Sequence, residues 1–362
     1  MKQNRVFLFC SGIDDVLNDL PKVAGIQVQM SFWAKTFGKY GWDVYSFSQT
    51  GNSHAIEDIQ FVKLFSSSLL SIIHLQSLVE WINCWKCILR KPDLVITRGA
   101  QRYLYLLSIL CKIWKIKLVY FGASDVNFIP GKEQIAGSKH NRHLYQKAIQ
   151  SMEYVVTQNQ AQHDALKRNY RKESLIMPNI WIPSEQKKHE KEYDAIWVSN
   201  LRPLKRAEWF LEVANRHPQF RFCIVGGYLD KDYYSSIQQK SQEIPNLSFL
   251  GAKSFEEVNT LIAKSRLLVC TSEYEGFPNT FLQAWAQSVP VVSTVNPNNV
   301  FENHKLGVYV ENVDSLCENT CTLLMDVQLY NDYMICIQNY FTENHSAVNG
   351  FVRLMNYMGF PN

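Results

Sequence analysis

The chain has 362 residues, of which 46% are hydrophobic and 19% charged, with a formal net charge of +4 at pH 7. The hydrophobic share is ample for packed cores, which excludes a disordered chain, and the length favours two domains. Because the charge is mild and no Lys/Arg-rich block occurs, no nucleic-acid partner is expected.

The nine cysteines are scattered among apolar residues, which is typical of reduced core thiols in a cytoplasmic protein. Cys84 and Cys87 have the spacing of a redox or half-zinc motif, but they lie in a helical pattern without a second pair, so core thiols are favoured. Neither the apolar run at residues 5–10 nor any later run is long enough for a signal peptide or a membrane-spanning helix.

The first half of the chain alternates short apolar runs with helical patterns. A strand at residues 5–10, a loop to residue 25, a helix at 26–41 and a strand at 42–47 form a βαβ unit, which predicts a parallel sheet. Because no G-x-G-x-x-G follows the first strand, a dinucleotide-dependent dehydrogenase is disfavoured. Further strands are expected at 59–61, 94–97, 117–121, 154–157 and 175–179, and further helices at 67–91, 103–114 and 141–152.

Two of these helical stretches, 67–91 and 103–114, are rich in Leu, Ile and Trp. Basic residues accompany them: Lys86, Arg90, Lys91, Lys112 and Lys115. One interpretation is a surface that contacts a membrane peripherally. The favoured alternative is a pair of packed core helices with basic ends, because apolar helices are usually buried.

A polar, Pro-led segment at residues 183–192 has the composition of an interdomain linker. Beyond it the β–α alternation restarts, with strands expected at 195–198, 220–225, 247–250, 267–271 and 290–292. We therefore predict an α/β protein with two Rossmann-like domains, residues 1–183 and 184–342, and a tail at 343–362.

The segment 270–294 combines a strand end, a loop containing Glu275 and Gly276, and a helix without an acid in its first turn. The N–H groups and dipole of such a turn favour an anion. Glu275 and Gln283 are spaced so that both can face one ligand. The alternative is a strand-loop-helix corner whose polar residues only satisfy turns and caps, and the residues alone leave both open.

The run EGFPNTFLQAW, followed by Val-Pro-Val-Val, resembles the signature of the retaining glycosyltransferases of family 4, which have the two-domain GT-B fold. The chain departs from that signature at Gln283, where the family usually has a second Glu that is thought to hold the donor ribose. The resemblance implies two domains facing a cleft and a tail that crosses back onto the first domain. It also implies a metal-independent retaining enzyme without a cofactor, which moves a sugar from a UDP- or GDP-sugar to a glycan or lipid-linked acceptor in cell-surface polysaccharide synthesis.

The same resemblance assigns roles to individual residues. Lys205 matches the lysine that binds the donor phosphates, and Ser199 stands where an arginine is usual, so Arg202 is a candidate replacement. Glu275 is expected to accept hydrogen bonds from the donor sugar. The other predicted donor-binding residues are Gly25, in the loop before the first long helix, and Gly276, Phe277, Asn279, Thr280 and Gln283.

Asp125 follows a strand end in a region that faces the acceptor in the resembled family, which makes it a candidate contact or base. An Asx-turn is an equally good interpretation of this residue. Two other functions stay open: a nucleotide-sugar epimerase or phosphorylase on the same fold, and a sugar-nucleotide-binding protein without catalysis.

Overall fold

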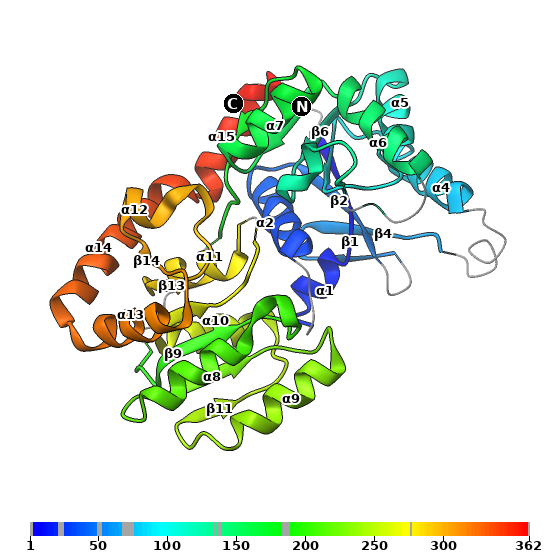
Figure 1. The fold of residues 1–362 in the computed structure, drawn as a ribbon. Helices are drawn as coiled ribbons and strands as arrows, with labels where there is room; N and C mark the ends of the chain where they lie inside the picture. Colours follow the sequence, from blue (N-terminus) through cyan, green and yellow to red (C-terminus); the bar gives the residue numbers. More distant parts are fainter. Residues whose placement is uncertain are drawn as a thin grey trace. The chain divides into compact units, whose positions relative to one another are not determined.

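The computed structural model describes residues 3–20, 25–48, 53–66, 76–133, 135, 139–182, 189–275 and 277–360. The chain divides into two compact units, each an α/β layer structure (Figure 1). Unit 1 comprises Met1–Asn18, Val23–Ile180 and His345–Asn362, and unit 2 comprises Asp19–Lys22 and Trp181–Asn344.

The sheet of unit 1 has eight strands in the order β3-β4-β2-β1-β5-β6-β7-β8. They are β1 (Arg5–Ser11), β2 (Asp43–Ser48), β3 (His54–Ile56), β4 (Ile59–Lys63), β5 (Leu94–Arg98), β6 (Lys117–Phe121), β7 (Tyr154–Thr157) and β8 (Leu175–Ile176). All neighbours pair in parallel except β3 and β4. The central strands β1 and β5 are almost entirely buried, as expected for a parallel sheet covered on both faces.

The helices of unit 1 are α1 (Ile13–Leu17), α2 (Gly25–Lys39), α4 (Gln76–Ile88), α5 (Leu104–Ile113), the 3₁₀ turn η1 (Asp125–Phe128), α6 (Lys139–Ser151), α7 (Gln160–Tyr170) and α15 (Ala347–Met358). Helix α15 packs on α2, where the rings of Tyr40 and Phe351 stack with centroids 4.0 Å apart. A Cβ on Gly350 would lie 2.5 Å from Ile180, so the helix approaches the end of the Leu175–Ile180 segment closely. The tail is thus part of the core of unit 1.

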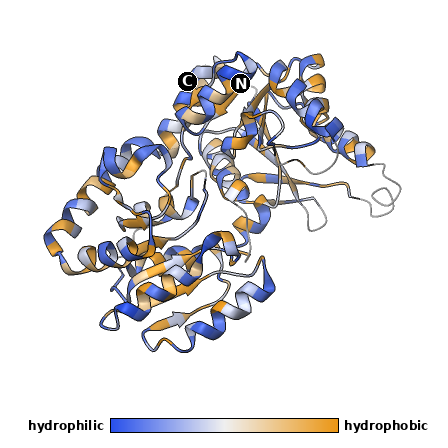
Figure 2. Ribbon diagram, in the orientation of Figure 1, coloured by the Kyte–Doolittle hydropathy of each residue, from blue (hydrophilic) through white to orange (hydrophobic). Residues whose placement is uncertain are grey.

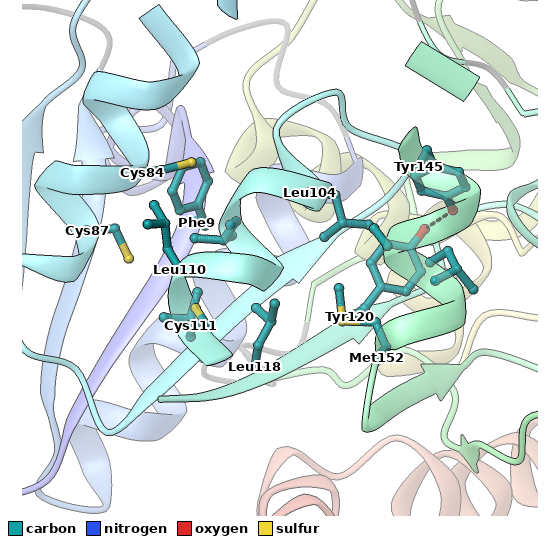
Figure 3. Close-up of a cluster of buried hydrophobic side chains, with 14 of the residues drawn as sticks. Phe9, Cys84, Cys87, Leu104, Leu110, Cys111, Leu118, Tyr120, Tyr145 and Met152 are labelled. Carbon is teal, nitrogen blue, oxygen red and sulfur yellow. Dashed lines mark hydrogen bonds between the residues drawn. The ribbon is translucent and has the colours of Figure 1, made fainter. Parts of the chain in front are cut away.

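One buried cluster in unit 1 lies between the sheet and the helices α4, α5 and α6 (Figure 3). Cys84, Cys87 and Cys111 pack there among Leu and aromatic side chains, and burial raises the pKa of the Cys111 thiol to about 12. In the described residues no group of His, Cys, Asp or Glu is arranged to hold a metal ion. These cysteines are core thiols.

The sheet of unit 2 is entirely parallel in its described pairs, in the order β11-β10-β9-β12-β13-β14. Its strands are β9 (Tyr193–Val198), β10 (Phe222–Val225), β11 (Leu247–Phe249), β12 (Ser265–Cys270), β13 (Val291–Ser293) and β14 (Gly307–Tyr309). Its helices are η2 (Pro203–Lys205), α8 (Ala207–Arg216), α9 (Lys231–Ser241), α10 (Phe255–Ala263), α11 (Asn279–Ala286), η3 (Pro297–Asn299), α12 (Val300–His304), α13 (Val313–Met325) and α14 (Val327–Asn344). Hydrophobic strands with mixed helices around them give each unit an apolar centre (Figure 2).

The elements that the sequence pattern missed are short. The three-residue strands β3 and β14 and the five-residue helix α1, which lies in the expected loop at 11–25, each span less than the window in which periodicity is visible. Helix α4 covers only the second part of the helix expected at 67–91, and residues 67–75 lie outside the described part.

Candidate functional site

The carboxyl edge of the sheet in unit 2 brings together two predicted site residues that are 70 positions apart in the sequence. Lys205, in η2 after β9, donates from Nζ to Oε1 of Glu275, in the loop after β12. The Ser272 hydroxyl lies 3.1 Å from the same carboxylate oxygen. The Lys205 side chain is only 10% exposed and that of Glu275 24%, so this ion pair is largely shielded from water.

Backbone and hydroxyl contacts fix the position of this pair. The Thr271 hydroxyl donates to the Lys205 carbonyl at 2.6 Å and accepts from the Trp197 indole at 2.9 Å. Arg206 donates from Nε to the Thr271 carbonyl at 2.8 Å and from Nη2 to the Ser272 carbonyl at 3.1 Å. Sequence reasoning missed Arg206, whose guanidinium ties η2 to the loop that carries Glu275.

Close approach of the backbone at this edge depends on a glycine. Gly226 follows β10, and a Cβ there would lie 1.7 Å from the Ser199 carbonyl oxygen. No other residue fits between these two strand ends without moving the backbone. Ser199 itself is held through its N–H, which donates to the Val225 carbonyl at 3.1 Å.

Helix α11 begins directly beyond this loop. Asn279 and Thr280 lie in its first turn, where backbone N–H groups have no acceptor within the helix, and no acid lies in that turn. The buried residues Phe281, Leu282 and Trp285 anchor the helix to the core. Phe277 lies against Trp285 with ring centroids 6.0 Å apart, whereas Gly276 lies outside the described residues.

Two predicted donor-binding residues, Gln283 and Arg202, form no hydrogen bond with the Lys205–Glu275 pair. Gln283 is 5% exposed and donates from Nε2 to Asn259 Oδ1 on α10 at 2.9 Å. Arg202 is exposed before η2, and its guanidinium has no hydrogen-bond partner among the described residues.

Asp230 and Asp232 have Asp-x-Asp spacing, but Asp230 caps α9 by accepting from the Tyr233 N–H at 3.0 Å.

At the carboxyl edge of the sheet in unit 1, polar side chains form a continuous chain of hydrogen bonds. Asp125 Oδ1 accepts from the amides of Asn159 at 3.1 Å and Gln162 at 3.0 Å. Gln162 also donates to Gln158 Oε1, and Gln158 in turn donates from Nε2 to Asn179 Oδ1 at 2.8 Å. Asp125 thus has a fixed carboxylate, and its role toward an acceptor stays a prediction.

Arg98 ends this chain and was not predicted. It closes β5, is 6% exposed, and donates from Nη2 to Asn179 Oδ1 at 2.7 Å. Burial lowers the pKa of its guanidinium to about 10, so it is charged at neutral pH. Arg98 lines a pocket of about 380 Å³, which Ile26 and Gln27 of α2 also line. Gly25 is the first residue of α2 and not, as predicted, part of the preceding loop.

Helices α4 and α5 pack their inner faces into the core, as the favoured interpretation expected, and their outer faces are exposed. The exposed apolar side chains on or next to these helices are Leu78, Trp81, Leu89, Ile109, Ile113 and Trp114, with exposed fractions from 39% to 69%. Trp85 links Trp81 and Trp114 through edge contacts at 5.8 and 5.0 Å. No helix in the described part of the chain is both long and apolar enough to span a membrane.

Comparison with known families supports the motif of unit 2. Residues 192–326 match the family described as glycosyl transferases group 1. The matched segment lies within unit 2 and is similar to that family. The match includes Lys205, Glu275 and Gln283, and it ends near the start of α14.

Curated relatives share limited identity with the chain. The Vi polysaccharide biosynthesis protein VipC/TviE of Salmonella typhi is 29% identical over 101 residues, which cover 27% of this chain and 17% of the relative. An uncharacterised glycosyltransferase of Methanocaldococcus jannaschii is 24% identical over 234 residues, 56% of each protein. The chain therefore spans less than two thirds of the length of these relatives.

Solved structures confirm the fold over the whole chain. The S. aureus protein TarM, solved as a mutant with fondaparinux, α-GlcNAc-glycerol and UDP, superposes with a TM-score of 0.72 at 14% identity, covering 98% of this chain and 99% of that one. WaaG, a glycosyltransferase involved in lipopolysaccharide biosynthesis, gives 0.66 at 15% identity over 93% and 95%. The predicted two-domain GT-B fold is thus confirmed.

Proposed function

We propose that this chain is a retaining, metal-independent glycosyltransferase. It would transfer a sugar from a UDP- or GDP-sugar to a glycan or lipid-linked acceptor in the synthesis of a cell-surface polysaccharide. The observation that carries the proposal is the shielded Lys205–Glu275 pair beside the first turn of α11. The group 1 match of residues 192–326 supports the reaction class. The Vi polysaccharide relative and the likeness to WaaG support the pathway.

The site chemistry follows from where charge develops. When the bond between the sugar and the diphosphate breaks, negative charge accumulates on the phosphate oxygens. The Lys205 ammonium and the N–H groups of Asn279 and Thr280 are the donors suited to stabilise it. As Lys205 turns to a phosphate, the Glu275 carboxylate becomes available to hydroxyls of the donor sugar. Before the donor binds, the ion pair therefore keeps the Lys205 and Glu275 side chains in place.

Gln283 and Asp125 complete the proposal. Asn259 holds the Gln283 amide nitrogen, which leaves Oε1 to accept from a ribose hydroxyl. Asp125 Oδ1 is held by two amides, and Oδ2 is the atom that would accept a hydrogen bond from the acceptor. Retention and metal independence rest on the family resemblance of the motif.

Thermal-shift measurements with UDP-, GDP- and ADP-sugars test the donor site. We expect sugars of one nucleotide to stabilise the wild type. Lys205→Ala should lose the response to the free nucleoside diphosphate, and Glu275→Ala only the extra response to the sugar. Glu273→Ala, which removes an exposed carboxylate two positions away, is the matched control. If no donor stabilises the wild type, the proposal fails.

A binding protein without catalysis is the second candidate. It is favoured by Gln283, whose neutral amide replaces a carboxylate and is already engaged by Asn259. Release of free sugar or transfer to an acceptor by the purified protein separates the two candidates. Donor stabilisation without any turnover of a panel of donors would favour the binding protein.

We also propose that the outer faces of α4 and α5 contact an anionic membrane surface from the cytoplasm. Exposed tryptophans and Leu89 are flanked by the exposed cations Arg90, Lys112 and Lys115, which suits apolar insertion together with attraction to lipid headgroups. Trp81→Ser with Trp114→Ser should reduce co-sedimentation with phosphatidylglycerol vesicles. The control is Leu229→Ser, which changes an exposed leucine of unit 2. Equal sedimentation of all variants would contradict membrane contact.

A further inference from the structure

The pocket in unit 1 lies where three parallel strands end. Phe9 and Ser11 of β1, Phe47 of β2 and Arg98 of β5 line it, and its volume of about 380 Å³ falls in the range of small-molecule sites. The Phe9 and Tyr103 rings form one wall, with centroids 4.4 Å apart. Ligands of parallel α/β sheets collect at this edge.

Arg98 forms no ion pair with any residue that the structure describes. Its one described hydrogen bond goes to the neutral amide of Asn179, and its buried Nε has no partner among those residues. Cys10, its neighbour in the pocket, is neutral because burial raises the pKa of the thiol to about 12. A buried cation without a counter-charge is costly, so such a group is retained where a ligand supplies the charge.

Two of the described carboxylates near the pocket, Glu80 and Asp14, form no ion pair with Arg98. Glu80 lines the pocket, but its Oε1 lies 3.2 Å from Arg102 Nε. The charge of Glu80 is therefore balanced by Arg102. Asp14 is buried in α1, and its Oδ2 lies 3.9 Å from His54 Nε2. Neither carboxylate is within ion-pair distance of Arg98.

A second source of positive potential reaches the same pocket. Ile26 and Gln27 line it from the first turn of α2, a helix of 15 residues with no acid in that turn. The N–H groups of this turn have no acceptor within the helix, and the positive end of the dipole lies there. The helix start and the Arg98 guanidinium therefore favour an anion at one place.

We propose that this pocket binds an acidic group on the acceptor, a carboxylate or a phosphate attached to a sugar ring, and that Arg98 is the residue that selects it. The guanidinium receives the anion through its fork of N–H donors. The Phe9 and Tyr103 rings pack against the C–H face of the sugar, and Gln101, which also lines the pocket, bonds its hydroxyls. The inference rests on the proposed transferase function and names the chemistry of its acceptor.

Ligand-observed NMR titration of the full chain tests this with three probes that share one ring: methyl glucuronide, glucose 6-phosphate and methyl glucoside. We expect at least one acidic probe to bind the wild type about tenfold more tightly than the neutral glucoside, the size of one charge-assisted hydrogen bond. The preferred acidic probe distinguishes carboxylate from phosphate. Arg98→Gln should lose the preference, and Arg98→Lys should keep part of it.

Lys205→Ala is the matched control, because it removes the buried cation of unit 2 and leaves the pocket intact. The acidic preference should survive it. Equal binding of acidic and neutral probes, no binding of any probe, or a preference lost in Lys205→Ala and kept in Arg98→Gln would each overturn the inference. If Arg98→Gln does not fold, the wild type and Arg98→Lys decide. Failure here with intact stabilisation by nucleotide sugars leaves the proposed function standing.

Discussion

Each unit of this protein has a buried basic residue at the carboxyl edge of its parallel strands. The two residues differ in whether they have an ion-pair partner among the described residues. As a whole residue, Lys205 in unit 2 is 8% exposed, and it forms an ion pair with Glu275. Arg98 in unit 1 is 6% exposed and, among the described residues, has only the amide of Asn179. An anion that binds Lys205 would separate an existing ion pair, whereas the ligand proposed for unit 1 would supply a missing partner.

The choice of cation fits this difference. Lys205 is buried together with a carboxylate, which supplies its counter-charge. An arginine remains charged at neutral pH even after burial has lowered its pKa, as it has for Arg98. Arginine therefore suits a buried site without a counter-charge better than lysine does.

The largest expected effect comes from breaking the pair in unit 2. Glu275→Ala leaves Lys205 buried without a counter-charge, and we expect it to lower the free energy of unfolding by about 2 kcal/mol, less than for a fully buried pair because Glu275 is partly exposed. Urea denaturation measures this, with Glu273→Ala as control. The double variant Lys205→Met/Glu275→Ala should lose less than the sum of the single variants; additive losses would mean that the pair contributes nothing.

An effect of similar or smaller size is expected in unit 1 on acidification. His345 is fully buried, donates from Nδ1 to the Asn179 carbonyl at 2.7 Å, and has its pKa lowered by burial from 6.5 to about 4. Below pH 6.5 the unfolded chain binds a proton that the folded chain does not, so folded stability present above that pH is lost as pH falls toward 4. The loss between pH 6.5 and 5 should be about 2 kcal/mol at most.

The pH series is read as the difference between variants, because carboxylates also titrate in this range. His345→Gln should remove the His345 contribution, so that its stability falls less steeply with acid than that of the wild type. His304→Gln, which changes an exposed histidine of unit 2, should leave the slope unchanged. Parallel slopes for wild type and His345→Gln would show that His345 is protonated in the folded state.

The sequence made the residues of the candidate donor site easier to recognise than those of the pocket for a physical reason. Residues 270–294 hold a strand, its loop and the following helix in one contiguous run, so the spacing of Glu275 and Gln283 is visible in the sequence. Arg98 and Asn179 are 81 positions apart and meet only through the order of strands in the sheet. A basic residue at a strand end is also usually exposed, so nothing in the local pattern marks Arg98 as buried.

The exposed apolar side chains of α4 and α5 were not predicted individually, for a related reason. Apolar residues lie on more than one face of each helix, so the sequence alone does not show that Trp81 and Trp114 are exposed. Only the packing of Cys84, Cys87 and Leu110 into the core identifies the buried side.

The smallest expected change separates the two cations most sharply. Arg98→Met replaces an unpaired buried charge by an apolar chain of similar length, and Asn179 keeps its bond from Gln158, so the free energy of unfolding should change by less than about 1 kcal/mol or rise. Urea denaturation with and without the acidic probe measures both effects. The probe should stabilise the wild type and not the variant, because only a ligand of the folded state shifts the midpoint. A loss of about 3 kcal/mol or more, the size expected for a broken buried pair, would make Arg98 a structural residue and remove the contrast with Lys205.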